Sequence, residues 1–164
     1  MEENIVDGGQ QLADDPILDS HLGWEVFQAL ASNRGREAVV DCTTKPSACN
    51  AGSILVLSTL LADRLRKETT GNRVGIVLPP GIAGIVSNLA AIFAGKSPVN
   101  LNFSLGREAL EASIERAEID LILTADTVRK RLPDFPWPER ILDVGAELRG
   151  FTKLGLVMRS MLLA

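Results

Sequence analysis

The sequence predicts an α/β fold in which helices flank an open and mostly parallel sheet. Short apolar segments alternate with helical patterns through most of the chain, as in repeated strand and helix units. The strand segments show no polar alternation, which is typical of parallel strands buried on both faces. Residues 73–106 indicate a strand, a tight turn, a buried helix, a second strand and a turn, with no charged residue between Arg73 and Lys96. Short connections between such units favour right-handed crossovers within one sheet.

Three elements are expected before this central stretch. Residues 24–31 have a helical pattern that stops at residues 34–35, and we expect this helix to pack against the sheet. Residues 37–42 predict a short strand rich in β-branched residues, and the residues directly behind it have turn chemistry. Ser53 is the expected N-cap of the next helix, which continues to about Lys67.

The central stretch contains two strands and a helix without charge. Residues 73–78 and 97–102 are the expected strands, and the helix over residues 82–93 is expected to be the most buried one. Ser104 or Gly106 begins a surface helix whose inward residues are Leu110, Ile114 and Ala117.

The last third of the chain continues the alternation. Residues 119–123 and 141–144 predict strands, with a short helix over residues 124–131 and a proline-broken connection between them. From residue 146 the pattern is helical, and residues 155–164 are strongly apolar. This tail predicts hydrophobic surface, which we interpret as a sign of truncation inside a larger domain.

Composition limits the possible functions. The chain has 164 residues, of which 46% are hydrophobic, and this is enough for one domain with its own core. A net charge of -4 and dispersed basic residues argue against nucleic-acid binding, and the basic residues 129–131 are expected to complement a helix C-terminus. Cys42 and Cys49 lack the spacing of a zinc or redox site and are expected to be reduced thiols.

We divide the chain into an acidic, flexible leader at residues 1–19 and a partial α/β subdomain at residues 20–164. The leader lacks the basic end and apolar run of a signal peptide, which predicts a cytoplasmic location, with membrane association left open for a longer parent protein. Residues 74–95 carry no charge, but the prolines and glycine at residues 79–81 divide them into pieces too short to span a membrane.

Few side chains suggest chemistry. His21 is the single histidine and is expected to be solvated, and we expect neither a metal site nor a catalytic set. The turn at residues 79–81 lies where open α/β sheets bind anions, although two prolines remove N–H donors, so a structural turn is favoured. Asn100 and Asn102 share one side of a strand near the same edge. They are weak candidates for substrate binding, and closing the following turn is the favoured alternative.

The segment RVGIVLPPGIAGIVSNLAAIFAGKSPVNLNFSLG, followed by REALEASIERAEIDLILTAD, resembles the N-terminal subdomain of the AMP-forming acyl-activating enzymes. These include acyl-CoA synthetases, luciferases and peptide-synthetase adenylation domains. The wording GKSPVNLNFS is most similar to the acyl-acyl-carrier-protein synthetase branch, including the synthetase part of 2-acylglycerophosphoethanolamine acyltransferases. The resemblance covers about residues 53–126 well and the flanks loosely.

This resemblance implies a parent enzyme that uses ATP and Mg²⁺ to convert a fatty acid to an acyl-adenylate, and then transfers it to acyl carrier protein or CoA. The sequence contains no Ser/Thr/Gly-rich loop ending in Lys-Gly, and it has no tyrosine for the family's aromatic motif. No catalytic residue can be carried over, so the chain alone is expected to be inactive and to bind no cofactor. Its expected partner is the remainder of the ligase.

Two other functions stay open at this point. The chain could be a free-standing Rossmann-like module that binds a small ligand at the sheet edge. It could also be an oligomerisation module in which the apolar tail pairs with a second copy.

Overall fold

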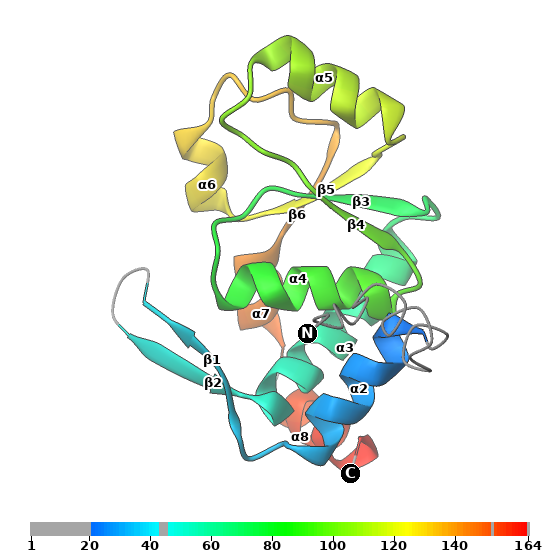
Figure 1. The fold of residues 1–164 in the computed structure, drawn as a ribbon, viewed down its shortest axis with the longest axis vertical. Coiled ribbons are helices and arrows are strands. Elements are labelled where there is room, and N and C mark those ends of the chain that lie inside the picture. Colours follow the sequence, from blue (N-terminus) through cyan, green and yellow to red (C-terminus); the bar gives the residue numbers. More distant parts are fainter. Residues whose placement is uncertain (1–20, 43–45, 152, 164) are drawn as a thin grey trace, which may run out of the picture.

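The computed structural model describes residues 21–42, 46–151 and 153–163, so the expected leader lies outside the described residues. Figure 1 shows a sheet with helices on both faces and a separate hairpin to one side, which confirms the expected fold class. The elements in chain order are α2 (Leu22–Ser32), β1 (Glu37–Asp41), β2 (Ser47–Asn50), α3 (Ala51–Glu68), β3 (Arg73–Ile76), α4 (Ile82–Phe93), β4 (Ser97–Asn100), α5 (Arg107–Arg116), β5 (Leu121–Thr124), α6 (Asp126–Arg131), β6 (Arg140–Asp143), α7 (Val144–Gly150) and α8 (Lys153–Leu162).

The main sheet has the order β4-β3-β5-β6, and each neighbouring pair of strands is parallel. β3 and β5 lie in the middle, and after Arg73 all of their residues are buried because helices cover both faces. The expected strands are therefore confirmed, although each is only four residues long. Parallel pairing brings the carboxyl ends of all four strands to one edge of the sheet.

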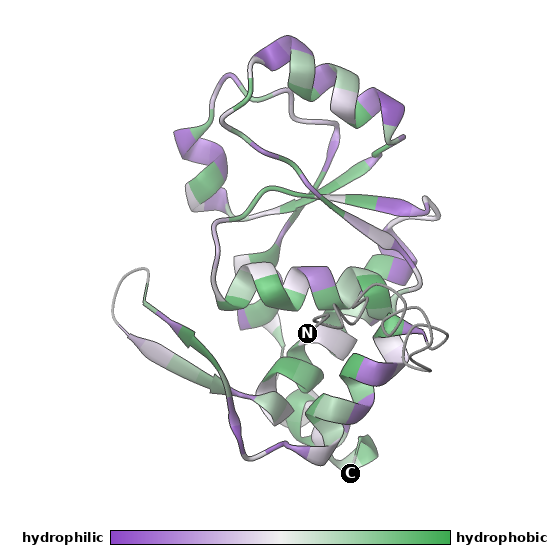
Figure 2. Cartoon of the chain, in the orientation of Figure 1, coloured by the Kyte–Doolittle hydropathy of each residue, from purple (hydrophilic) through white to green (hydrophobic). Residues whose placement is uncertain are grey.

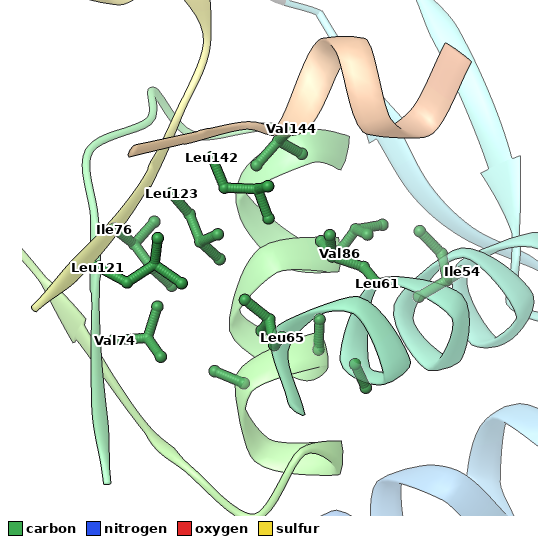
Figure 3. Packing of buried hydrophobic residues seen from close by; sticks show 13 residues of the cluster. Ile54, Leu61, Leu65, Val74, Ile76, Val86, Leu121, Leu123, Leu142 and Val144 are labelled. Atoms are coloured by element: carbon green, nitrogen blue, oxygen red, sulfur yellow. The ribbon is translucent and has the colours of Figure 1, made fainter. Parts of the chain in front are cut away.

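One face of the sheet packs against α4, and α4 packs against α3 (Figures 1 and 3). In Figure 3, Val74, Ile76, Leu121 and Leu123 project from the strands toward these helices. Leu65 of α3 belongs to the same buried cluster. Small residues such as Ala90 and Ala91 are fully buried in α4, which lets this helix lie close to its neighbours.

The other face is covered by α5, α6 and the connection that follows α6. Leu110 of α5 is buried together with Ile122 of the sheet and Phe135 of the connection. Ile114 and Ala117 pack against this cluster, so the inward side expected for α5 is confirmed. The sheet is thus the middle of three layers.

Two expectations about helix packing are wrong. α2 packs mainly on α3 and α4 rather than on the sheet, because α4 already covers that face. α3, and not α4, is the most buried helix, with eight buried residues against four. The reason is that α3 contacts α2, α4, α7, α8 and the hairpin, while α4 keeps an outer side where Ile85 is exposed.

The expected turn after residue 42 is partly wrong, because residues 47–50 form strand β2. β2 pairs antiparallel with β1 in a two-stranded sheet of its own. Residues 43–45 of the expected turn lie outside the described residues. The cap of α3 also differs from expectation: Asn50 is the N-cap, and its side-chain oxygen accepts a bond of 2.8 Å from the Ser53 backbone N–H.

Both cysteines are free thiols, as expected. The register pairs Cys49 with Val39, so Cys42 lies three residues further along the opposite strand. Burial raises the pKa of the Cys49 thiol, and a side-chain hydrogen bond with Ser53 partly opposes this rise.

The helical tail consists of two helices, α7 and α8, which Phe151 separates at the C-cap of α7. α8 packs on α3 and leaves Met161 and Leu162 exposed, so the expected apolar surface is present. Among the described residues, the helices are too short or too polar to cross a membrane.

We predict that Leu65→Ala lowers the free energy of unfolding by about 2–5 kcal/mol, because Leu65 is fully buried between α3, α4 and the sheet and a cavity would remain. Urea unfolding measures this change. Leu22→Ala is the control, since Leu22 is 62% exposed and its loss should change stability by about 0.5 kcal/mol at most. Equal losses for the two variants would contradict the packing described here.

Candidate functional site at the carboxyl edge of the sheet

The candidate site is the edge at which all four parallel strands end. Ligands of open α/β sheets bind outside the carboxyl ends of the strands, often at the N-terminus of a following helix. Here α4 follows β3, α5 follows β4, α6 follows β5 and α7 follows β6. The groups that approach these four helix N-termini therefore determine what the edge can bind.

The N-terminus of α4 is occupied by a carboxylate of the chain itself. Asp41, the last residue of β1, accepts a hydrogen bond of 3.2 Å from the backbone N–H of Ile82 through Oδ2. Gly81 has a φ of 146°, and a Cβ placed there would lie 2.4 Å from Asp41 Oδ2. A side chain at residue 81 would thus be strained and would collide with Asp41. This arrangement agrees with a structural role for the turn at residues 79–81.

A second carboxylate serves two helices. Asp143 lies at the end of β6, and its Oδ2 accepts a hydrogen bond of 3.0 Å from the backbone N–H of Asp126, the first residue of α6. Its Oδ1 accepts from the backbone N–H of Ala146 at 2.8 Å, in the first turn of α7. Three of the four helix N-termini at this edge thus hold an aspartate of the chain where an external anion would bind.

The two candidate asparagines do not act together. Asn100 Nδ2 donates to Asn88 Oδ1 at 2.9 Å, and Asn88 Nδ2 donates back to Asn100 Oδ1 at 3.2 Å. Asn102 Oδ1 instead accepts from the backbone N–H of Ser104 at 3.1 Å and from its hydroxyl at 2.7 Å. Asn102 therefore closes the turn after β4, whereas Asn100 joins β4 to α4. A substrate contact by either residue stays a prediction.

A small cleft of about 210 Å³ lies beyond this turn, between the start of α5 and the end of α6. Its walls include Phe103, Leu105 and Phe135, with Arg107 and Arg131 at the border. Arg107 is already engaged, because its Nε donates to Glu111 at 2.7 Å and its Nη1 donates to the carbonyl of Asp134 at 3.3 Å. Gly106, the N-cap of α5, offers no side-chain bond to that helix.

The opposite edge of the sheet carries a structural network. The Thr69 hydroxyl lies 2.8 Å from both carboxylate oxygens of Asp120, and Arg140 Nη1 reaches Asp120 Oδ2 at 3.1 Å. Lys96 Nζ donates to the carbonyl of Gly71 at 2.6 Å. These bonds join the segments that lead into the four strands.

His21 also has a local role. Its Nδ1 accepts from the backbone N–H of Gly23 at 3.1 Å, so it caps α2. Across the described ranges, no group of three or more His, Cys, Asp or Glu side chains could hold a metal ion.

Sequence reasoning missed both capping aspartates. Asp143 follows a predicted strand and precedes a helix, which is a typical N-cap signal, but nothing local shows that it also reaches α6. Asp41 lies far from α4 in the sequence, so no local pattern could have placed it there. Asn88 had a signal, because it is one of only two polar side chains, with Ser87, on an otherwise apolar helix.

Comparisons with known proteins rest on structure. No family model matches the sequence, and no curated protein matches it. The nonribosomal peptide synthetase FmoA3 (S1046A) in its AMPPNP-bound form matches 80% of this chain with a TM-score of 0.68 and 21% identity. The N-terminal subdomain of NpsA from Klebsiella oxytoca matches 80% of the chain with a TM-score of 0.63 and 13% identity. The chain has the fold of an adenylation-domain N-terminal subdomain.

This adenylation fold is shared with an artificially fused adenylation and PCP di-domain, NpsA-ThdA from Klebsiella oxytoca, at a TM-score of 0.65 and 14% identity over 80% of the chain. The chain spans only 14% of the FmoA3 polypeptide, 24% of the NpsA-ThdA fusion and 33% of the NpsA subdomain. The resemblance to adenylate-forming enzymes is therefore confirmed at the level of the fold, whereas closeness to acyl-acyl-carrier-protein synthetases stays a prediction.

We predict that Asp143→Ala lowers the free energy of unfolding by about 1–2 kcal/mol, because two helix N-termini lose their acceptor. Asp143→Asn keeps one acceptor oxygen and should lose less. Urea unfolding gives the energies, and hydrogen exchange should rise at the backbone amides of Asp126 and Ala146. Asp134→Ala is the control on an exposed aspartate, and an equal loss there would contradict the double capping role.

Proposed function

We propose that this chain is the N-terminal part of an AMP-forming ligase that activates a fatty acid with ATP and passes it to acyl carrier protein or CoA. The observation that carries the proposal is the fold, which matches adenylation N-terminal subdomains over 80% of the chain. The matched structures include one bound to AMPPNP, one bound to alpha-methyl-L-serine-AMP, and one fused to a PCP domain. The sequence resemblance over residues 53–126 supports the same family independently.

The carboxyl edge of the sheet supports the view that, in such a ligase, residues outside this chain bind ATP and Mg²⁺. Asp41 and Asp143 fill the N-termini of α4, α6 and α7, so these helices offer no open place for a nucleotide phosphate. Adenylate formation depends on positioning ATP, a metal ion and a carboxylate against one another in a preorganised site. We infer that ATP and Mg²⁺ are held by residues beyond this chain, and that the chain alone is inactive.

The fatty-acid substrate rests on a narrower base. Only the amino-acid sequence of residues 95–104 supports the acyl-acyl-carrier-protein synthetase branch, while the structural matches are peptide synthetases. The substrate class is therefore the part of the proposal that most needs an experiment. A cytoplasmic location and the absence of nucleic-acid binding are predictions from sequence alone.

We predict that the 164-residue chain gives no ATP–pyrophosphate exchange with any fatty acid or amino acid. The longer polypeptide encoded by its gene should catalyse this exchange with fatty acids. The coding sequence beyond Ala164 should contain a Ser/Thr/Gly-rich loop ending in Lys-Gly. Amino acids are the matched substrate control, because the structural relatives are peptide synthetases.

Three results would change the proposal. Exchange with amino acids alone would keep the ligase and reject the fatty acid. Exchange by the 164-residue chain would reject the view that residues outside it bind ATP and Mg²⁺. A stop codon directly after Ala164, with a saturable thermal shift on adding ATP, AMP or a fatty acid, would favour a free-standing binding module instead.

We predict that Asn100→Ala in the longer polypeptide raises KM for the carboxylate about 2- to 10-fold if its amide binds substrate, since a lost hydrogen bond is worth about 0.5–1.5 kcal/mol. Asn88→Ala is the matched control, because it breaks the same side-chain pair from α4. If Asn100 is purely structural, Asn100→Ala and Asn88→Ala should lower the melting temperature equally, and neither should change KM.

A further inference from the structure

The last helix, α8, is attached to the protein with little burial. Each of its residues 155–162 is half-buried or exposed, whereas α3, the helix on which it packs, has eight buried residues. The large apolar side chains that α8 exposes are those of Val157, Met158, Met161 and Leu162. Figure 2 shows the hydrophobic colour of the chain at this C-terminal end of the molecule. Burial of apolar side chains therefore contributes little to the attachment of α8.

The main hydrophobic cluster ends before α8. Phe151 packs against this cluster, and none of the described residues of α8 belongs to it. Phe151 is also the C-cap of α7, and α8 begins only at Lys153, so the helix is broken between the two elements. An open groove of about 590 Å³ lies between α8 and the first half of α3, with residues 156–157 on one side and residues 56–57 on the other. Close packing between α8 and α3 is thus incomplete.

Polar contacts hold α8 in place instead. Arg159 of α8 forms an ion pair and hydrogen bond with Asp63 of α3, and the Arg159 side chain is only 24% exposed. The guanidinium of Arg34 donates to the carbonyl of Ser160 at 3.1 Å and also to that of Leu163. Arg34 thus binds carbonyls at the end of α8, where a helix has no partners of its own for them. α8 therefore presents a charged side chain to the protein and apolar side chains to the solvent, the reverse of an ordinary surface helix.

Release of α8 would leave no charge buried without a partner. Asp63 contacts Arg159 through Oδ2, while its Oδ1 accepts a hydrogen bond of 2.8 Å from Arg66 of the same helix. The Asp63 side chain is 42% exposed, so water can replace Arg159 at the second oxygen. Breaking a buried ion pair is costly because one charge stays unpaired in the interior, and that cost does not arise here.

We propose that α8 is a detachable strap, which leaves α3 as a unit while the rest of the fold stays intact, and that Arg159 and Arg34 control its release. Local opening occurs in the parts of a protein that have few buried apolar contacts and exposed hydrogen bonds, as α8 has. Salt weakens the attraction between exposed charges, so a higher ionic strength favours release. Release uncovers the side of α3 that lines the groove. This inference does not depend on the proposed ligase function.

Hydrogen exchange of the full 164-residue chain, measured by mass spectrometry, tests the proposal. We expect the amides of residues 156–162 to exchange roughly 100-fold faster than those in the centre of α3, yet about tenfold slower than in an unfolded peptide. Arg159→Gln and Arg34→Gln should each raise exchange in α8 about 2- to 10-fold, as the loss of one hydrogen bond would, without changing exchange in α3 or the melting temperature.

Two further variants and a salt series complete the test. Arg159→Lys keeps the charge and should exchange like the wild type. Arg107→Gln is the matched control, because it removes an arginine that pairs with Glu111 at 2.7 Å on the distant helix α5, and it should leave α8 unchanged. Raising NaCl from about 0.05 to 0.5 M should speed exchange in α8 of the wild type, and should do so less in Arg159→Gln.

Four results would each overturn the proposal. Exchange in α8 as slow as in α3 would mean that α8 opens only when the whole molecule unfolds. Exchange as fast as in an unfolded peptide would mean that the polar contacts do not hold α8. Faster exchange in α3 and α4 as well, with a lower melting temperature for Arg159→Gln, would make α8 part of the cooperative core. No change in α8 with either glutamine variant would mean that the two arginines do not control its release.

Discussion

Strands of four residues form few hydrogen bonds each, so this sheet depends on being covered from both sides. α4 provides most of that cover on one face, and its small residues let it sit between the strands and α3. Because α4 covers one face of the sheet, the positions left for the remaining helices are restricted. α2 and α8 pack against helices because the sheet face is already taken, and α5 and α6 cover the opposite face. The molecule is layered for this reason.

Two aspartates determine which groups occupy the carboxyl edge of the sheet. A helix N-terminus attracts negative charge, and here the side chains of the chain itself supply that charge. Asp41 joins the hairpin to α4, while Asp143 joins β6 to both α6 and α7. At three helix N-termini of this edge, a backbone N–H group is therefore hydrogen-bonded to a carboxylate of the chain itself.

The sequence predicted best where one local pattern determines the structure. The stretch from β3 to β4 has apolar runs, a proline and glycine turn and a helical segment of ordinary length. These local features are compatible with only one order of elements, namely strand, turn, helix and strand. Prediction failed where distant residues decide. β2 needs β1 as a partner, and the position of α2 depends on what already covers the sheet. Asn50 displaced Ser53 as the cap, which is a local competition between two good candidates. Of the candidate site, the edge was predicted and its two aspartates were not.

The order β4-β3-β5-β6 has a consequence for how such a chain emerges from the ribosome. β3 is made first, β4 joins one side of it, β5 joins the other side, and β6 extends beyond β5. Each new strand thus meets an edge that is already complete and never has to insert between two paired strands. A nascent polypeptide can build this sheet stepwise during translation, before any later region has been synthesised.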